Sequence, residues 1–160
     1  MKFRLLLALS ILPFAANAVV IRSDVDDSKY RIDRSEFPAL ADMPGEGHGV
    51  LIARKWVVTA AHAAPMEGMD AEVIINGEGY KVARVIVHPG FKRMPDALGQ
   101  EALKTGDPSR IHAFLAGSDD IALIELDTPV EHVAPVALYR GNDEVTKVAM
   151  FVGKGATGNG

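Results

Sequence analysis

Residues 48–62 read HGVLIARKWVVTAAH, and this segment carries the clearest structural signal in the chain. Residues 48–53 are apolar and rich in β-branched side chains, which is typical of a strand, and residues 56–60 form a second such run. Arg54 and Lys55 form the turn between the two runs. The segment therefore predicts two consecutive strands, with His62 just beyond the end of the second.

A hairpin is predicted directly after this segment. Ala71–Ile75 and Tyr80–His88 are strand-like runs, and Asn76-Gly77 lies between them. An Asn-Gly pair is typical of a tight hairpin turn, because both central residues of that turn need a positive φ. The sequence therefore predicts an antiparallel pair of strands here.

The remaining segments complete a mostly β chain. The polar residues 19–46, with several Pro and Gly, are expected to form an arm along the surface with a short strand at Val19–Arg22. Further strands are expected at Asp120–Leu126 and Val145–Val152. Six or so strands without strand–helix alternation predict an all-β antiparallel barrel or sandwich.

One connection is unusually long. Lys92–Gly117 is polar, contains Pro and Gly, and includes a helical turn or two at Ala97–Lys104. Connections of this length are uncommon in compact domains and often lie near functional sites.

The first 18 residues have the features of an export signal. Lys2 and Arg4 precede the apolar run Leu5–Phe14, and Ala16-Asn17-Ala18 is a small-x-small cleavage site. The run is shorter than the ~20 apolar residues that span a bilayer. We therefore expect cleavage after Ala18, a mature chain without a membrane segment, and a secreted or periplasmic location.

The composition excludes several classes of function. The chain has 160 residues, 48% of them hydrophobic and 24% charged, with a formal net charge of −4. This acidic balance argues against a nucleic-acid-binding surface. Without cysteine there is no disulfide, no Cys-ligated zinc and no thiol nucleophile. No cofactor or metal is expected.

Two motifs give a specific resemblance. WVVTAAH at residues 56–62 and Asp120-Ile121-Ala122-Leu123, in this order, resemble the histidine and aspartate motifs of the trypsin/chymotrypsin-like serine proteases. VARVIVHPGF (82–91) and VAMFVGKGATGNG (148–160) resemble two further segments of that family. The resemblance implies a six-stranded Greek-key barrel over residues 47–160, the N-terminal half of the family's double barrel.

The resemblance also implies roles for two residues. His62 would be the general base and then the general acid, and Asp120 would orient it and stabilise its imidazolium form. The substrate would be a protein or peptide. A serine hydroxyl needs such a base, because it is a weak nucleophile at neutral pH.

Ordinary structural roles compete with these assignments. A histidine after a strand is commonly only a strand-end residue, and a carboxylate before a strand is commonly a cap. Asp119 is a rival to Asp120, although the family often has asparagine at its position. Structural or solvated roles are expected for the other histidines and for an acidic group near the N-terminus: His48, His88, His112, His132, Asp24, Asp26 and Asp27.

The family's nucleophile motif is missing from these residues. No Gly-Asp-Ser-Gly-Gly-type run occurs, and Ser109 and Ser118 stand in other contexts. Ala63 replaces a cysteine common in the family, and Lys154 stands where an aromatic residue is frequent. The serine, oxyanion hole and specificity pocket belong to the family's second barrel. We therefore expect this chain alone to lack peptidase activity.

Three hypotheses remain open. The chain is the N-terminal part of an exported trypsin-like endopeptidase, truncated before the serine. Alternatively, it is a non-catalytic, protease-like binding or interaction barrel. In the third, a separate chain supplies the missing C-terminal barrel.

Overall fold

A computed structural model describes residues 19–20, 24–45, 47–66, 69–153 and 157–158. The expected export signal at residues 1–18 and the departure at Lys154 lie outside the described residues. The chain divides into two units, residues 32–154 and a smaller unit of residues 1–31 with 155–160.

The smaller unit contains a short parallel strand pair. In it, β1 (Val19–Val20) pairs with β8 (Thr157–Gly158). The 3₁₀ helix η1 (Asp27–Tyr30) is capped by Asp26, which accepts a hydrogen bond from the Ser28 backbone N–H. The strand expected at Val19–Arg22 is present at its first two residues, and residues 21 and 22 lie outside the described part of the chain.

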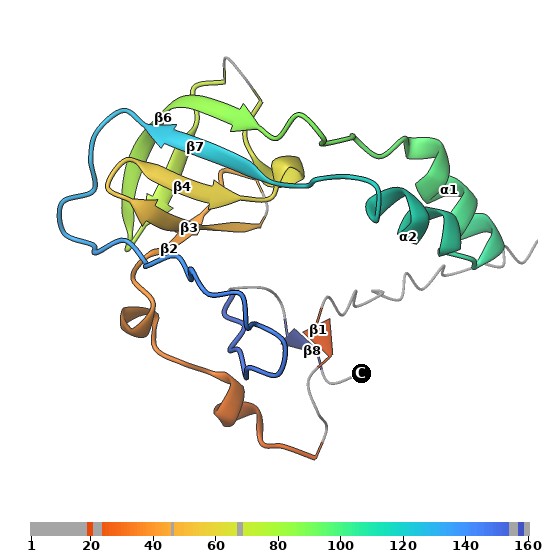
Figure 1. Cartoon of the computed structure of the whole chain (residues 1–160), viewed down its shortest axis with the longest axis horizontal. Coiled ribbons are helices and arrows are strands. Elements are labelled where there is room, and N and C mark those ends of the chain that lie inside the picture. The colour runs from red at the N-terminus through yellow and green to blue at the C-terminus, as the bar shows by residue number, and fades with distance from the viewer. Residues whose placement is uncertain (1–18, 21–23, 46, 67–68, 154–156, 159–160) are drawn as a thin grey trace, which may run out of the picture. The chain divides into compact units, whose positions relative to one another are not determined.

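The larger unit is built around a closed antiparallel barrel of six strands (Figure 1). Neighbouring strands follow the order β2-β3-β4-β7-β6-β5, and β5 closes the barrel by pairing with β2. Because β5, β6 and β7 are consecutive neighbours and β4 lies beside β7, this is a Greek-key order. The predicted all-β barrel is confirmed. Its strands are β2 (Leu40–Asp42), β3 (His48–Ala53), β4 (Trp56–Thr59), β5 (Glu72–Ile75), β6 (Glu78–Val87) and β7 (Ala122–Leu126).

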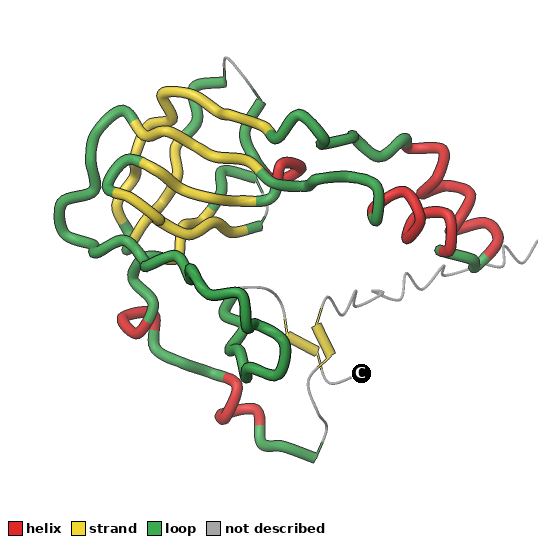
Figure 2. The backbone as a smooth tube through the Cα atoms, viewed as in Figure 1, coloured by secondary structure: helices red, strands yellow, loops and turns green. Residues whose placement is uncertain are grey.

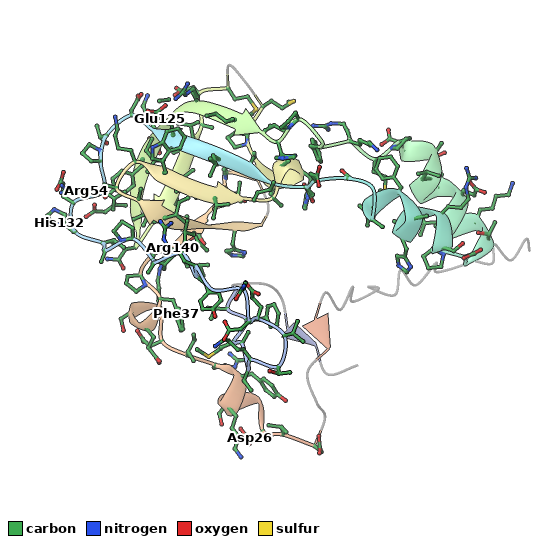
Figure 3. All side chains as sticks on the ribbon, viewed as in Figure 1. Asp26, Phe37, Arg54, Glu125, His132 and Arg140 are labelled. Carbon is green, nitrogen blue, oxygen red and sulfur yellow. The ribbon has the colours of Figure 1, made fainter. Side chains whose placement is uncertain are left out.

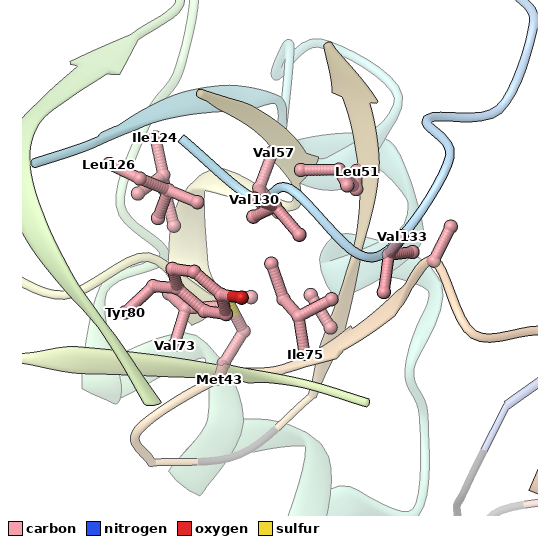
Figure 4. Close-up of a cluster of buried hydrophobic side chains, with 12 residues drawn as sticks. Met43, Leu51, Val57, Val73, Ile75, Tyr80, Ile124, Leu126, Val130 and Val133 are labelled. Carbon is pink, nitrogen blue, oxygen red and sulfur yellow. The ribbon is translucent and has the colours of Figure 1, made fainter. Parts of the chain in front are cut away.

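Alternation along the strands fills the barrel interior. In β7, Ala122, Ile124 and Leu126 are buried, while the residues between them are only partly covered. Successive side chains of a strand point to opposite faces, so one face of β7 lines the core. Figure 4 shows Ile124 and Leu126 in the buried cluster with side chains from the other strands. The fully buried large side chains are Leu51, Val57, Val73, Ile75, Ile124, Leu126 and Val130.

A polar cluster crosses the outer face of three strands. Glu125 of β7 pairs in register with Trp56 of β4 on one side and Arg84 of β6 on the other. Arg84 Nε donates to Glu125 Oε2 at 2.8 Å, and its guanidinium lies 5.7 Å from the Trp56 ring centroid. Figure 3 labels Glu125 and also Arg54, whose side chain forms an ion pair with Glu131. Cross-strand pairs of this kind favour one register over its neighbours.

The sequence predicted the two hairpins well. β3 has the predicted bounds, β4, β5 and β7 differ from their predictions by one or two residues at one end, and β6 starts two residues earlier and ends one residue earlier than predicted. Asn76 and Gly77 have φ values of 51° and 90°, as the predicted turn between β5 and β6 requires.

The strand predicted at Val145–Val152 is wrong. These residues form no strand, and Val148 and Phe151 are 101% and 97% exposed. The barrel offers no free edge to this run, since β5 and β2 already pair with each other. Apolar β-branched residues alone do not make a strand when no partner strand is available.

The sixth barrel strand is β2, which the sequence did not predict because it lies inside the predicted arm. The sequence predicts an arm over residues 19–46, but Leu40–Asp42 within it pairs with both β3 and β5 and belongs to the barrel. A three-residue strand ending in Asp, close to Pro38 and Pro44, has too little periodicity to be recognised. The 3₁₀ helix η2 (Arg34–Glu36), with its Asp33 capping box, precedes this strand.

A helical pair fills the long connection between β6 and β7. α1 (Asp96–Thr105) contains the expected helical turns at Ala97–Lys104, and α2 (Ser109–Leu115) was not predicted. Figure 2 shows the two helices side by side. Neither they nor any other helix within the described ranges has the length and apolar character needed to cross a bilayer.

The closed barrel predicts a steep cost for removing a core side chain. Leu51→Ala should lower the free energy of unfolding by about 2–5 kcal/mol, because Leu51 is fully buried and the cavity is only partly refilled. Urea unfolding followed by circular dichroism measures this change. The matched control is Leu103→Ala on α1, where Leu103 is 89% exposed and the change should stay within about 0.5 kcal/mol. Equal losses in the two variants would contradict the described core.

Candidate functional site

His62 lies at the end of β4, on a short helical turn. It is the middle residue of the 3₁₀ helix η3 (Ala61–Ala63), and the buried Ala61 anchors this turn against the barrel. Thr59 Oγ1 donates to the His48 carbonyl at 2.9 Å, which ties the end of β4 to the start of β3. The His62 side chain itself is 60% exposed. The barrel thus fixes the backbone of His62 and leaves its ring at the surface.

Asp120 reaches the same barrel rim from the neighbouring strand. β4 and β7 are antiparallel, with Thr59 paired to Ala122. Residues just after Thr59 and just before Ala122 therefore meet at one end of the strand pair. This register brings together two residues that are 58 positions apart in the sequence.

The Asp120 carboxylate holds His62 at two points. Its Oδ2 lies 2.6 Å from the ring nitrogen Nδ1, and its Oδ1 accepts the His62 backbone N–H at 2.9 Å. Because a carboxylate only accepts hydrogen bonds, the contact favours the tautomer with a proton on Nδ1. The other ring nitrogen, Nε2, is then available as a proton acceptor.

Asp120 is held in its ionised form. Partial burial raises the pKa of the Asp120 carboxyl, but hydrogen bonds from the His62 ring and from the backbone N–H groups of His62 and Ala61 outweigh this effect. The charge of the imidazolium acts in the same direction. The pKa of Asp120 therefore lies below its usual value, so the carboxylate can stabilise a positive charge on His62 at neutral pH.

The other sequence candidates lie elsewhere. Asp119, the rival to Asp120, contacts His88 Nδ1 at 3.3 Å and not His62. His48 contacts Asp42 at 3.7 Å, while His112 and His132 are exposed. Asp26 caps η1. Ser118 Oγ is bonded to the Lys92 backbone, accepting from its N–H at 2.9 Å and donating to its carbonyl at 3.2 Å.

A shallow groove beside His62 was not found from the sequence. Its lining combines the β2–β3 turn with the segment after His62: Pro44, Gly45, Ala63, Ala64, Pro65, Met66 and Met69. The lining is largely apolar, so it suits an apolar chain segment next to the His62 ring. The two contributing segments are far apart in sequence, and only the barrel brings them together.

The arrangement of His62 and Asp120 can accept and return a proton. No group of three or more His, Asp or Glu side chains suited to a metal ion occurs in the described part of the chain. The imidazole is exposed, and its Nδ1 is bonded to the partly buried Asp120 carboxylate. Nε2 is then free to accept a proton, as a general base requires.

The chain is similar to known proteins over most of its length. The family model described as Trypsin matches residues 28–160. The thrombin-like enzyme acutobin of Deinagkistrodon acutus is 26% identical over 157 residues, covering 95% of this chain and 54% of that enzyme. Ovochymase of Halocynthia roretzi is 28% identical over 99 residues, covering 56% of this chain and 5% of that protein. The chain thus spans about half of the first relative and a small part of the second.

A solved structure is also similar. Neuropsin, a serine protease expressed in the limbic system of mouse brain, matches with a TM-score of 0.47 and 24% identity. The match covers 68% of this chain and 46% of the neuropsin chain.

The lowered pKa of Asp120 predicts a pH-dependent contribution to stability. Its contribution is fully present above the usual aspartate pKa of 3.8 and is lost as the pH falls through the lower pKa of the folded state. Asp120→Asn should therefore be less stable than the parent at neutral pH, and the difference should shrink in strong acid. Urea unfolding at both pH values measures it.

The control for this experiment is Asp70→Asn. Asp70 pairs with Lys81 at 3.3 Å, but its side chain is 86% exposed, and such pairs contribute little. A loss for Asp120→Asn that is no larger than the loss for Asp70→Asn, or that persists unchanged in acid, would contradict the stabilising contact with His62.

Proposed function

The chain belongs to the trypsin family, and on this premise we propose that it supplies the general base and the orienting carboxylate of a serine endopeptidase. The observation that carries the proposal is the two-point contact between Asp120 and His62, at 2.6 Å to Nδ1 and 2.9 Å to the backbone nitrogen. A carboxylate that only capped a turn would not also need to bind the ring.

The proposed roles follow the mechanism of the family. His62 Nε2 takes the proton of a serine hydroxyl as that oxygen attacks the carbonyl carbon of a peptide bond. The resulting imidazolium is stabilised by Asp120 and then gives its proton to the leaving amine. The substrate is accordingly a protein or peptide, and no metal or cofactor enters these steps.

The nucleophile is proposed to lie outside these 160 residues. The sequence contains no Gly-Asp-Ser-Gly-Gly-type run, and the Ser118 hydroxyl is bonded to the Lys92 backbone. The serine, the oxyanion-hole donors and the specificity pocket would then come from a second barrel. Without them, most of the rate enhancement of such a site is lost.

An exposed apolar segment supports a partner barrel. Val145, Val148, Met150 and Phe151 are each at least 70% exposed. Several large apolar side chains exposed to water within a short segment favour association. A second barrel of the family, in the same polypeptide or as a separate chain, is proposed to cover them.

Export is proposed from the N-terminal sequence. Residues 1–18 combine a basic start, a short apolar run and the Ala16-Asn17-Ala18 cleavage site. A secreted or periplasmic location suits an enzyme that acts on external proteins.

The activity experiment compares two preparations. The purified 160-residue chain should show no turnover of peptide or ester substrates. The product of the native gene, with any coding sequence that follows residue 160, should hydrolyse them. In that product His62→Ala should lower kcat/KM about 100- to 10,000-fold, because the general base is lost.

The matched control is His132→Ala, which removes an exposed histidine and should leave kcat/KM unchanged. Turnover by the 160-residue chain that depends on His62 would contradict the proposal that the nucleophile lies elsewhere. A folded native product without turnover would contradict the endopeptidase proposal and favour a non-catalytic binding barrel.

The N-terminus gives a separate test of export. Mass spectrometry of the protein recovered outside the cytoplasm of its source should find Val19 as the first residue. Recovery only inside cells, with residues 1–18 retained, would contradict the export signal.

A further inference from the structure

The chain segment after β6 and the segment before β7, which contains Asp120, remain hydrogen-bonded to each other beyond the ends of the two strands. β6 ends at Val87 and β7 begins at Ala122, but the chain segments next to these ends remain bonded to each other. The residues on either side of Asp120 are both held in this way. The bonds are His88 N–H to the Ile121 carbonyl at 3.0 Å, Asp119 N–H to the Gly90 carbonyl at 3.1 Å, and Lys92 N–H to Ser118 Oγ at 2.9 Å.

The Asp119 side chain occupies the space that a side chain at residue 90 would need. A Cβ added to Gly90 would lie 1.9 Å from Asp119 Oδ2 and 2.9 Å from its Cγ. Gly90 is not among the glycines with positive φ, so its backbone conformation is open to other residues. A side chain at residue 90 would therefore displace the Asp119 carboxylate from its position over the Gly90 backbone.

The His88 ring contacts both Asp119 and Gly90. Its Nδ1 lies 3.3 Å from Asp119 Oδ2 and 3.2 Å from the Gly90 backbone nitrogen. A protonated Nδ1 donates to Asp119, and an unprotonated Nδ1 accepts from the Gly90 N–H. One of the two bonds is therefore available in either protonation state of the ring.

We infer that Asp119 and Gly90 are positioning residues for Asp120. This inference rests on the proposed function, since it concerns how the orienting carboxylate is held against His62. Asp120 is at the barrel rim with its side chain 32% exposed, so core packing alone does not fix it. The contact of Asp119 with Gly90 and His88 fixes the backbone next to Asp120, as a hydrogen bond of 2.6 Å requires.

Shape, not charge, is the property of Asp119 that matters here. The Asp119 side chain is 64% exposed, and an ion pair in that setting is weak because water screens it. Asp119→Asn keeps the size of the side chain and its ability to bond His88. Asp119→Ala removes both.

The test follows a proton that reports directly on Asp120. The backbone N–H of His62 donates to Asp120 Oδ1, so its hydrogen exchange rate, measured by NMR on the full chain, reports loosening of Asp120. The internal reference is the Leu126 N–H, which is bonded to the Lys55 carbonyl at the other end of β7. Global destabilisation would accelerate both protons, whereas loss of positioning accelerates only the first.

Two pairs of variants separate the explanations. Asp119→Ala should accelerate exchange at His62 several-fold relative to Leu126, while Asp119→Asn should resemble the parent. Gly90→Ala should also accelerate it, because the new Cβ displaces Asp119. Gly99→Ala in α1, where a Cβ meets nothing within 4 Å, should have no effect.

Three results would overturn the inference. They are a parent-like His62 N–H in Asp119→Ala, equal acceleration in Asp119→Ala and Asp119→Asn, or equal acceleration at His62 and Leu126. If Gly90→Ala does not fold, the two Asp119 variants decide alone. The measurement needs no turnover, so its failure and the failure of the endopeptidase proposal are distinguishable.

Discussion

The antiparallel pairing of β4 with β7 is the interaction on which the site depends. With Thr59 opposite Ala122, the chain leaving β4 and the chain entering β7 meet at one rim of the barrel. A slip of one residue would turn Ile124 and Leu126 from the core toward solvent. The energy that fixes this register therefore comes from the buried side chains, and the outer contacts of Glu125 with Arg84 reinforce it. Core packing thus brings His62 and Asp120 to the same rim of the barrel.

The site combines a rigid backbone with exposed side chains. Ala61 is buried and Thr59 is bonded to the His48 carbonyl, so the turn that carries His62 is well anchored. On the other strand, Asp120 lies between Asp119 and Ile121, both of which are bonded to the segment after β6. The imidazole itself remains open to water and to a reacting group. This accessibility suits the proposed role of His62 as a base for a nucleophile from another part of the protein.

Sequence reasoning succeeded where local signals and burial agree. The alternation in β7, the Asn76-Gly77 turn and the apolar runs on both sides of Arg54 each specify a local structure. It failed for Leu40–Asp42 and Val145–Val152, because strand formation there depends on a distant partner. The first segment has only three residues but pairs with β3 and β5, while the second is longer and rich in apolar residues but has no free strand edge to pair with. The groove beside His62 and the packing of Asp119 over Gly90 were missed for the same reason, because each is formed by segments that are separate in the sequence.

Sequence alone predicted the class of fold, the positions of five of the six barrel strands, and His62 with Asp120 as its preferred and Asp119 as its rival carboxylate. These are properties of short motifs, in which the residue types and their spacing carry the information. The tertiary structure decided which strand closes the barrel, which of the neighbouring carboxylates Asp119 and Asp120 binds His62, and how that carboxylate is held. Those outcomes depend on register between strands that are distant in sequence, and register is set by the packing of the whole core.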